Sequence, residues 1–96
     1  MILEHALLTI KPGQSAAFEA AMAEARPLIA ASPGFRSIAV HKSCENPDSY
    51  LLLVEWDDIA SHRDGFRTSE RYEHWRALLH RFYDPMPVVG YFGDSL

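Results

Sequence analysis

Apolar residues are concentrated in short segments that turn-forming residues separate. Residues 2–10 (ILEHALLTI), 35–44 (FRSIAVHKSC) and 49–56 (SYLLLVEW) are rich in apolar side chains and predict three strands. The sequence ENPD at residues 45–48 is typical of a tight turn, so the second and third strands should form a hairpin. A last strand is expected over residues 87–93, after two prolines.

Helical spacing of apolar residues predicts helices over residues 14–31 and 69–83, with a short helical segment over 58–66. The apolar stripe of the first helix is formed by Phe18, Met22, Ala25 and Ile29. The apolar face of the last helix is formed by Tyr72, Trp75, Leu78, Leu79 and Phe82. Ser15 and Ser69 are the expected N-caps. Pro27 should kink or shorten the first helix.

The resulting order β-α-β-β-α-β predicts a single α+β domain over residues 1–96 with ferredoxin-like topology and a four-stranded antiparallel sheet. The first and third strands are apolar at both odd and even positions, which is typical of strands buried on both faces. The second strand alternates apolar residues with Arg36, His41 and Lys42, as an edge strand does. Strands one and three should therefore lie in the middle.

Two helices can cover only one face of such a sheet. The other face would then expose a contiguous apolar surface, which monomers rarely do beyond a few hundred Å². A second copy packed sheet against sheet would cover it most simply, and we therefore expect a homodimer. The alternative is that the second face is only moderately apolar and stays in contact with water.

The composition narrows the class of protein. The net charge of −4 argues against nucleic acid or an anionic membrane as the main partner, because both select basic surfaces. A single cysteine, Cys44, allows neither an internal disulfide nor a cysteine zinc cluster, and no histidine pair has metal-ligand spacing, so no metal is expected. No apolar run approaches the roughly 20 residues of a membrane span, and the first five residues lack a positively charged leader. We expect a cytoplasmic protein.

Several short motifs occur in an order that resembles the antibiotic biosynthesis monooxygenase family. They are IKPG at residues 10–13, SPGF at 32–35, NPDSY at 46–50, LVEWD at 53–57, His62 and FRTS at 66–69. The resemblance implies a dimeric α+β barrel and an enzyme that needs no metal, haem or flavin. In the positions that the haem-degrading branch of this family uses, the chain has Ala6, Phe66 and Arg76, which do not match. No cofactor is therefore expected.

The second half of the chain combines aromatic residues with candidate acid–base groups. His62 is the candidate catalytic base, because histidine titrates near neutral pH, although a histidine there could equally serve packing or capping. Arg67 could stabilise an oxyanion, or only pair with Asp64 or Glu70 at the surface. The remaining candidates would bind substrate: His5, Phe66, Tyr72, Trp75, His80 and Tyr83. Each of them also fits an ordinary role in the core.

The expected function is oxidation by O₂ of a small, planar, electron-rich aromatic molecule, such as a quinol or a polyketide phenol. The protein would supply a dry apolar pocket, a base, and donors for the substrate anion. Two alternatives remain open on the same fold. One is an isomerase or lyase that uses no cofactor, and the other is a non-catalytic stress protein that binds a small molecule.

Overall fold

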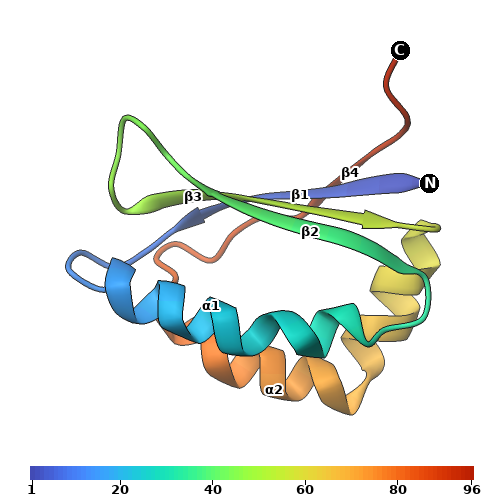
Figure 1. Cartoon of the computed structure of the whole chain (residues 1–96), viewed down its shortest axis with the longest axis horizontal. Coiled ribbons are helices and arrows are strands. Elements are labelled where there is room, and N and C mark those ends of the chain that lie inside the picture. Colours follow the sequence, from blue (N-terminus) through green and yellow to red (C-terminus); the bar gives the residue numbers. More distant parts are fainter.

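A computed structural model describes all 96 residues and confirms the ferredoxin-like α+β fold. The main elements are β1 (Ile2–Thr9), α1 (Ser15–Ala30), β2 (Phe35–Lys42), β3 (Ser49–Trp56), α2 (Glu70–Leu79) and β4 (Gly90–Phe92). The four strands form one antiparallel sheet in the order β2-β3-β1-β4, so the first and third strands lie in the middle as predicted. Both helices pack beneath the same face of the sheet (Figure 1).

The register of the two central strands decides which side chains face the helices. In β1 and β3, Ala6 pairs with Leu52 and Leu8 with Tyr50. All four side chains are buried, and they pack against the stripe of α1 that contains Phe18. Because side chains alternate across a strand, every even-numbered residue of both central strands points toward this core.

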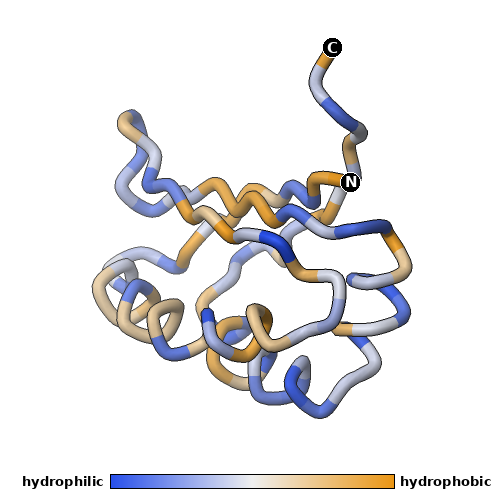
Figure 2. Tube along the Cα trace, turned by 45° about the vertical axis from the view of Figure 1, so that its right-hand side comes forward, coloured by the Kyte–Doolittle hydropathy of each residue, from blue (hydrophilic) through white to orange (hydrophobic).

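The opposite face of the sheet carries no helix, and it is apolar as the sequence predicted. Its apolar side chains are Leu3, Leu7, Ala39, Leu51, Leu53 and Phe92. Leu7 is 62% exposed and Phe92 is 55% exposed in the single chain. Figure 2 shows the hydrophobic strands with helices on one side only. We call this surface the open face.

Neither the shortening expected at Pro27 nor the N-cap expected at Ser15 is observed in α1. Pro27 lies inside the helix and does not end it, because the helix continues to Ala30. The carbonyl that loses its partner belongs to Ala23, and both residues lie on the exposed side, where water can bind that carbonyl. Ser15 is not the N-cap, because Gln14 takes that position without a side-chain bond. The Ser15 hydroxyl instead donates to the carbonyl of Pro47 at 3.0 Å.

The second half departs from the predicted boundaries where it approaches the sheet. The segment expected as one short helix is a π-helix (Ser61–Gly65) followed by a 3₁₀ turn (Phe66–Thr68). Ser69 is the N-cap of α2, as predicted, and its hydroxyl accepts a hydrogen bond from the N–H of Tyr72 at 3.2 Å.

The end of the chain also differs from the prediction. A 3₁₀ turn (His80–Phe82) follows α2, which shortens the helix expected to reach residue 83. β4 contains only three residues instead of the seven expected, because Pro85 and Pro87 have no N–H for a sheet ladder. No helix of the chain is both long and apolar enough to cross a bilayer.

Candidate active site

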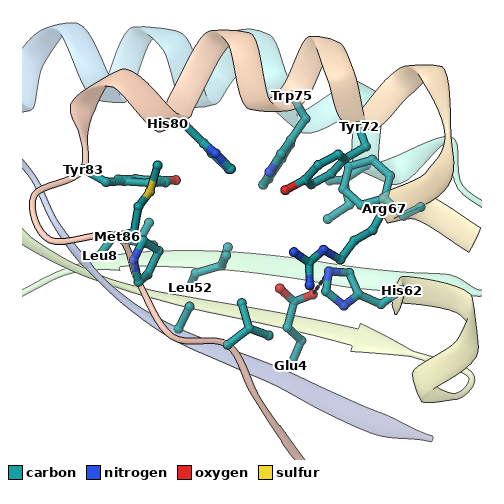
Figure 3. Close-up of a pocket in the computed structure, with 15 residues that line it drawn as sticks. Glu4, Leu8, Leu52, His62, Arg67, Tyr72, Trp75, His80, Tyr83 and Met86 are labelled. Carbon is teal, nitrogen blue, oxygen red and sulfur yellow. Dashed lines mark ion pairs between the residues drawn. The ribbon is translucent and has the colours of Figure 1, made fainter. Parts of the chain in front are cut away.

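A cavity of about 270 Å³ lies between the sheet and α2 (Figure 3). Its floor is apolar and comes from the central strands, through Ala6, Leu8 and Leu52. Met86 and Val89, in the segment between α2 and β4, form one side. This volume is slightly below the roughly 300–1,000 Å³ that ligand pockets usually have. The cavity therefore suits a small ligand that is mostly apolar.

Glu4 places a carboxyl group in this apolar floor. It is an even-numbered residue of β1, so it points toward the helices, and only 3% of it is exposed. Its Oε1 accepts a hydrogen bond from the indole N–H of Trp56 at 2.9 Å. Its other oxygen makes no bond within the protein and points into the cavity in Figure 3. One oxygen is thus anchored and the other is free to meet a ligand.

His62 lies beside Glu4 and bridges it to the edge strand. The wide turn of the π-helix carries the imidazole to the sheet, where the residue is 4% exposed. Its Nε2 lies 3.4 Å from Oε1 of Glu4, and its Nδ1 lies 2.6 Å from the hydroxyl of Tyr91. Tyr91 is directly opposite Glu4 in the β1–β4 register. Both ring nitrogens of His62 therefore have partners inside the protein.

The charge states of this pair follow from its burial. Burial raises the pKa of Glu4, while the Trp56 hydrogen bond and the positive charge of Arg67 oppose that rise. Burial and Arg67 together lower the pKa of His62 to about 4. An ionised Glu4 at 3.4 Å would favour the imidazolium, but burial of both side chains makes the cost of a charge on His62 larger. At pH 7 the pair is a neutral imidazole beside a carboxyl group, and not an ion pair.

The tautomer of His62 can be assigned from its neighbours. Burial raises the pKa of Tyr91, so its hydroxyl keeps its proton. When Glu4 is ionised it can only accept, so the proton of the neutral His62 belongs on Nε2, which faces Oε1 in a long contact of 3.4 Å. Nδ1 then accepts from the Tyr91 hydroxyl. The arrangement gives a chain of donors that runs from the edge strand to the carboxylate.

Arg67 supplies positive charge at the same end of the cavity. It lies in the 3₁₀ turn that follows the π-helix, and its guanidinium lies 5.8 Å from the centre of the Tyr72 ring. Figure 3 shows the guanidinium pointing into the cavity above Glu4. Arg67 makes no salt bridge with Asp64 or Glu70, which were its expected surface partners. Its donors remain available to an anionic ligand.

The aromatic wall opposite the sheet comes from α2 and the turn that follows it. His80 lies between Tyr72 and Tyr83, with ring centres 6.1 and 5.6 Å away. Burial, followed by the charges of Arg76 and Arg67, lowers the pKa of His80, so its ring is neutral at pH 7. Figure 3 shows His80 and Tyr83 directed at the space above Leu8 and Leu52.

The structure brings together seven of the eight residues that the sequence predicted for a site. The seven that line the cavity are His62, Phe66, Arg67, Tyr72, Trp75, His80 and Tyr83. His5 is not among them. Its odd position on β1 turns it to the open face, where it contacts the ring of Phe92 at 5.6 Å between centres. We therefore exclude His5 from this site.

Sequence reasoning missed Glu4, Trp56 and Tyr91. Glu4 could have been noticed, because it shares its face with Ala6, Leu8 and Ile10 in a strand that was predicted to be buried on both sides. A carboxyl group in such a strand requires a partner. No comparable signal marked Tyr91, since its role depends on the pairing of β4 with β1.

No three His, Cys, Asp or Glu side chains are arranged to hold a metal ion. The polar groups of the site are instead suited to proton transfer and to binding an anion. Fold and site together define a small ferredoxin-like domain with an acid–base pocket between its sheet and its last helix.

Comparison with known proteins agrees with this class. The sequence model of the antibiotic biosynthesis monooxygenase family matches residues 1–78, and the chain belongs to that family. The uncharacterized protein YczJ of Bacillus subtilis (strain 168) is 45% identical over 94 residues, which cover 98% of this chain and 99% of YczJ.

Two solved structures illustrate the likeness. A Bordetella bronchiseptica protein that carries the same family name superposes with a TM-score of 0.94 at 36% identity, over 99% of this chain and 97% of the other. SnoaB of Streptomyces nogalater, a cofactor-independent oxygenase, gives a TM-score of 0.86 at 19% identity, over 99% and 93% of the two chains. At that identity, the likeness to SnoaB is one of fold.

Proposed function

We propose that this protein is a cofactor-independent monooxygenase that oxidises a small electron-rich aromatic molecule, a quinol or a polyketide phenol, with O₂. The observation that carries the proposal is the polar end of the cavity, where the Glu4–His62 pair and Arg67 meet beneath an otherwise apolar and aromatic wall. Membership of the family and the fold shared with SnoaB support it.

The chemistry requires that the substrate lose a proton before O₂ can react. A phenol is a poor electron donor to O₂, whereas its anion is a good one. A buried acid–base pair can take the proton, and the Arg67 guanidinium can stabilise the resulting anion. One oxygen atom then enters the ring as a carbonyl oxygen and the other leaves as water. The substrate supplies all four electrons, so no external reductant is needed.

The cavity favours a flat substrate. Rings from α2 and its following turn face the apolar floor, so that an aromatic ring inserted between them contacts both sides. Arg67 and Glu4 lie at one end of the cavity and His80 and Tyr83 at the other, and the hydroxyl of Tyr72 and the indole nitrogen of Trp75 point into the space between them. Oxygen atoms at opposite ends of an aromatic substrate would meet both sets.

Oxygen consumption tests the proposed function. A panel of quinols and anthrones is incubated with the protein in an oxygen electrode, and the rate above the uncatalysed oxidation is recorded. With ¹⁸O₂, we expect one labelled atom in the product. Turnover that continues at the same rate without O₂ would remove the proposal and favour the isomerase or lyase. Ligand binding with no turnover, unaffected by His62→Ala, would favour the non-catalytic binder.

We also propose that the open face is covered by a second copy of this chain. Strand spacing of about 4.8 Å and a rise of about 3.3 Å per residue give this face roughly 500 Å² on each copy. Two such faces bury an area close to the roughly 1,000 Å² at which specific interfaces begin. Only His5, His41 and Glu55 carry titratable groups on it, so that stacking two copies leaves few charges to desolvate.

A further inference from the structure

We propose that Glu4 is the base of this site, and that His62 and Tyr91 are positioning residues that aim its carboxylate into the cavity. The inference rests on the proposed function for the class of substrate, a phenol or an acidic carbon next to an aromatic ketone. It differs from the sequence-based expectation, in which His62 itself takes the proton.

Access to the cavity is the first argument. A base must reach the proton that it removes, within about 2.6–3.2 Å. His62 has Nδ1 against the Tyr91 hydroxyl and Nε2 at 3.4 Å from Oε1 of Glu4, so a substrate would have to displace the Glu4 contact to reach Nε2. Glu4 has a free oxygen that points into the cavity beneath Arg67. Geometry alone therefore favours the carboxylate.

Anchoring of the carboxylate is the second argument. The Trp56 N–H donates to Oε1 of Glu4, and the Nε2 of His62 lies 3.4 Å from the same atom. The other oxygen of Glu4 is therefore the acceptor that faces the cavity. Tyr91 donates to Nδ1 and so holds His62 in the tautomer that donates toward Glu4. A group that only filled space would not need three residues from β3, the π-helix and β4 to orient it.

The surrounding charges suit a base that works near neutral pH. Burial raises the pKa of Glu4, which makes its carboxylate a stronger proton acceptor. The groups that face it are Arg67, whose charge opposes that rise, and the neutral His62. In the step itself, the O–H or C–H bond of the substrate breaks, the proton goes to the free oxygen of Glu4, and the electron pair stays on the substrate. Arg67 lies where it can stabilise that anion.

Hydrogen exchange without oxygen tests the base separately from the oxygenase. Anthrone is the probe, because its C10 protons are acidic and their replacement by deuterium in D₂O under argon can be followed by proton NMR. We expect the wild-type protein to accelerate exchange, and Glu4→Gln to lower that acceleration by about 10²–10⁴-fold. Glu73→Gln, on the exposed surface of α2, is the matched control and should exchange like the wild type.

The pH profile distinguishes a positioning role from a purely structural one. His62→Phe removes the donor to Glu4 and should move the midpoint of the exchange rate to higher pH, whereas His62→Gln should restore most of the wild-type profile. Tyr91→Phe should give a smaller shift in the same direction. Circular dichroism of each variant verifies that it folds. Midpoints that stay unchanged in both His62→Phe and Tyr91→Phe would contradict the positioning roles.

The outcomes separate the two proposals. If Glu4→Gln accelerates anthrone exchange as much as the wild type does, the assignment of the base is overturned, even if O₂ uptake is present. Wild-type exchange that depends on Glu4 without any O₂ uptake confirms the base and removes the oxygenase. Wild-type protein that oxidises anthrone with O₂ but never accelerates exchange overturns the base and keeps the oxygenase. If the wild-type protein neither accelerates the exchange of anthrone nor oxidises it, the result counts against both the base and the oxygenase.

Discussion

The two faces of the sheet use similar residues for opposite purposes. Glu4 and His5 are neighbours in β1, yet the carboxyl group lies in the buried cavity and the imidazole lies on the open face. The difference comes from the period of two along a strand, which sends adjacent side chains to opposite sides. The role of a residue in β1 therefore depends less on its type than on whether its position is odd or even, because this decides which face of the sheet it occupies.

The largest expected effect comes from a pair of adjacent leucines. Leu8 is buried among the core residues under the sheet, and Leu7 is mostly exposed on the open face. Leu8→Ala should lower the free energy of unfolding by about 2–5 kcal/mol, because it opens a cavity. Leu7→Ala should cost less than about 1 kcal/mol in the monomer. Urea unfolding at low protein concentration measures both, and equal losses would contradict the assignment of the two faces.

Arg67 tests the buried face at its polar end. Arg67→Met keeps an unbranched apolar stem but removes the charged guanidinium, so a substrate anion would lose a donor. We expect kcat to fall by about 10²–10³-fold for an oxidised quinol, as when one oxyanion donor is removed. Arg63→Met is the control, because Arg63 is exposed and pairs only with Asp64. An equal fall in both variants would indicate a general loss of charge and not a role for Arg67 in the cavity.

His62 should make stability depend on pH. Its folded pKa of about 4 lies below the ordinary value of 6.5. As the pH falls from 7 to 5 the unfolded chain binds a proton there and the folded chain does not. Folding should therefore lose about 2 kcal/mol over that range.

The raised pKa of Glu4 has the opposite sign, because the folded chain takes up that proton first as the pH falls. We therefore propose to compare Glu4→Gln with the double variant Glu4→Gln/His62→Gln in urea at both pH values. The loss on acidification should be about 2 kcal/mol smaller in the double variant than in the single one, and His80, whose pKa is also lowered, should contribute equally to both. The same loss in both would show that His62 is not the responsible group.

The open face is tested by placing a charge on it. Leu7→Lys should weaken self-association at least tenfold, or about 1.4 kcal/mol, because two lysines would have to leave water at the interface. Ala17→Lys, on the exposed side of α1, should leave self-association unchanged. Sedimentation over a range of concentrations measures this. A wild-type chain that remains a 10.9 kDa monomer at micromolar concentration would refute the second copy.

The smallest effect is expected at His5. His5→Gln should leave anthrone exchange and quinol oxidation within about twofold of the wild type, because the side chain is on the other side of the sheet from the cavity. A large loss of turnover would show that the open face takes part in the reaction, and it would contradict the different roles assigned to the two faces.

The sequence was sufficient for the fold and for most of the cavity lining. Apolar residues at both odd and even positions of β1 and β3 identified the central strands, and the helical spacing of Tyr72 and Trp75 placed both on the inner side of α2. Such local periodicities survive because burying an apolar stripe is favourable in any arrangement that covers the sheet. The bounds of β3 and the N-cap at Ser69 could also be predicted, because turn residues and a capping serine are local signals as well.

Only the tertiary structure decided which acid–base groups meet. The contacts between Glu4, His62 and Tyr91 join β1, a π-helix and a three-residue edge strand. No local pattern in the sequence predicts that these three segments meet. The π-helix and the short β4 depend on long-range packing and pairing, so local propensity could not predict them. The sequence by itself thus determined a sheet with two apolar faces and an aromatic helix, because periodic burial is a local property. Folding alone determined which groups meet the carboxyl group of Glu4, because a network between distant segments is not local.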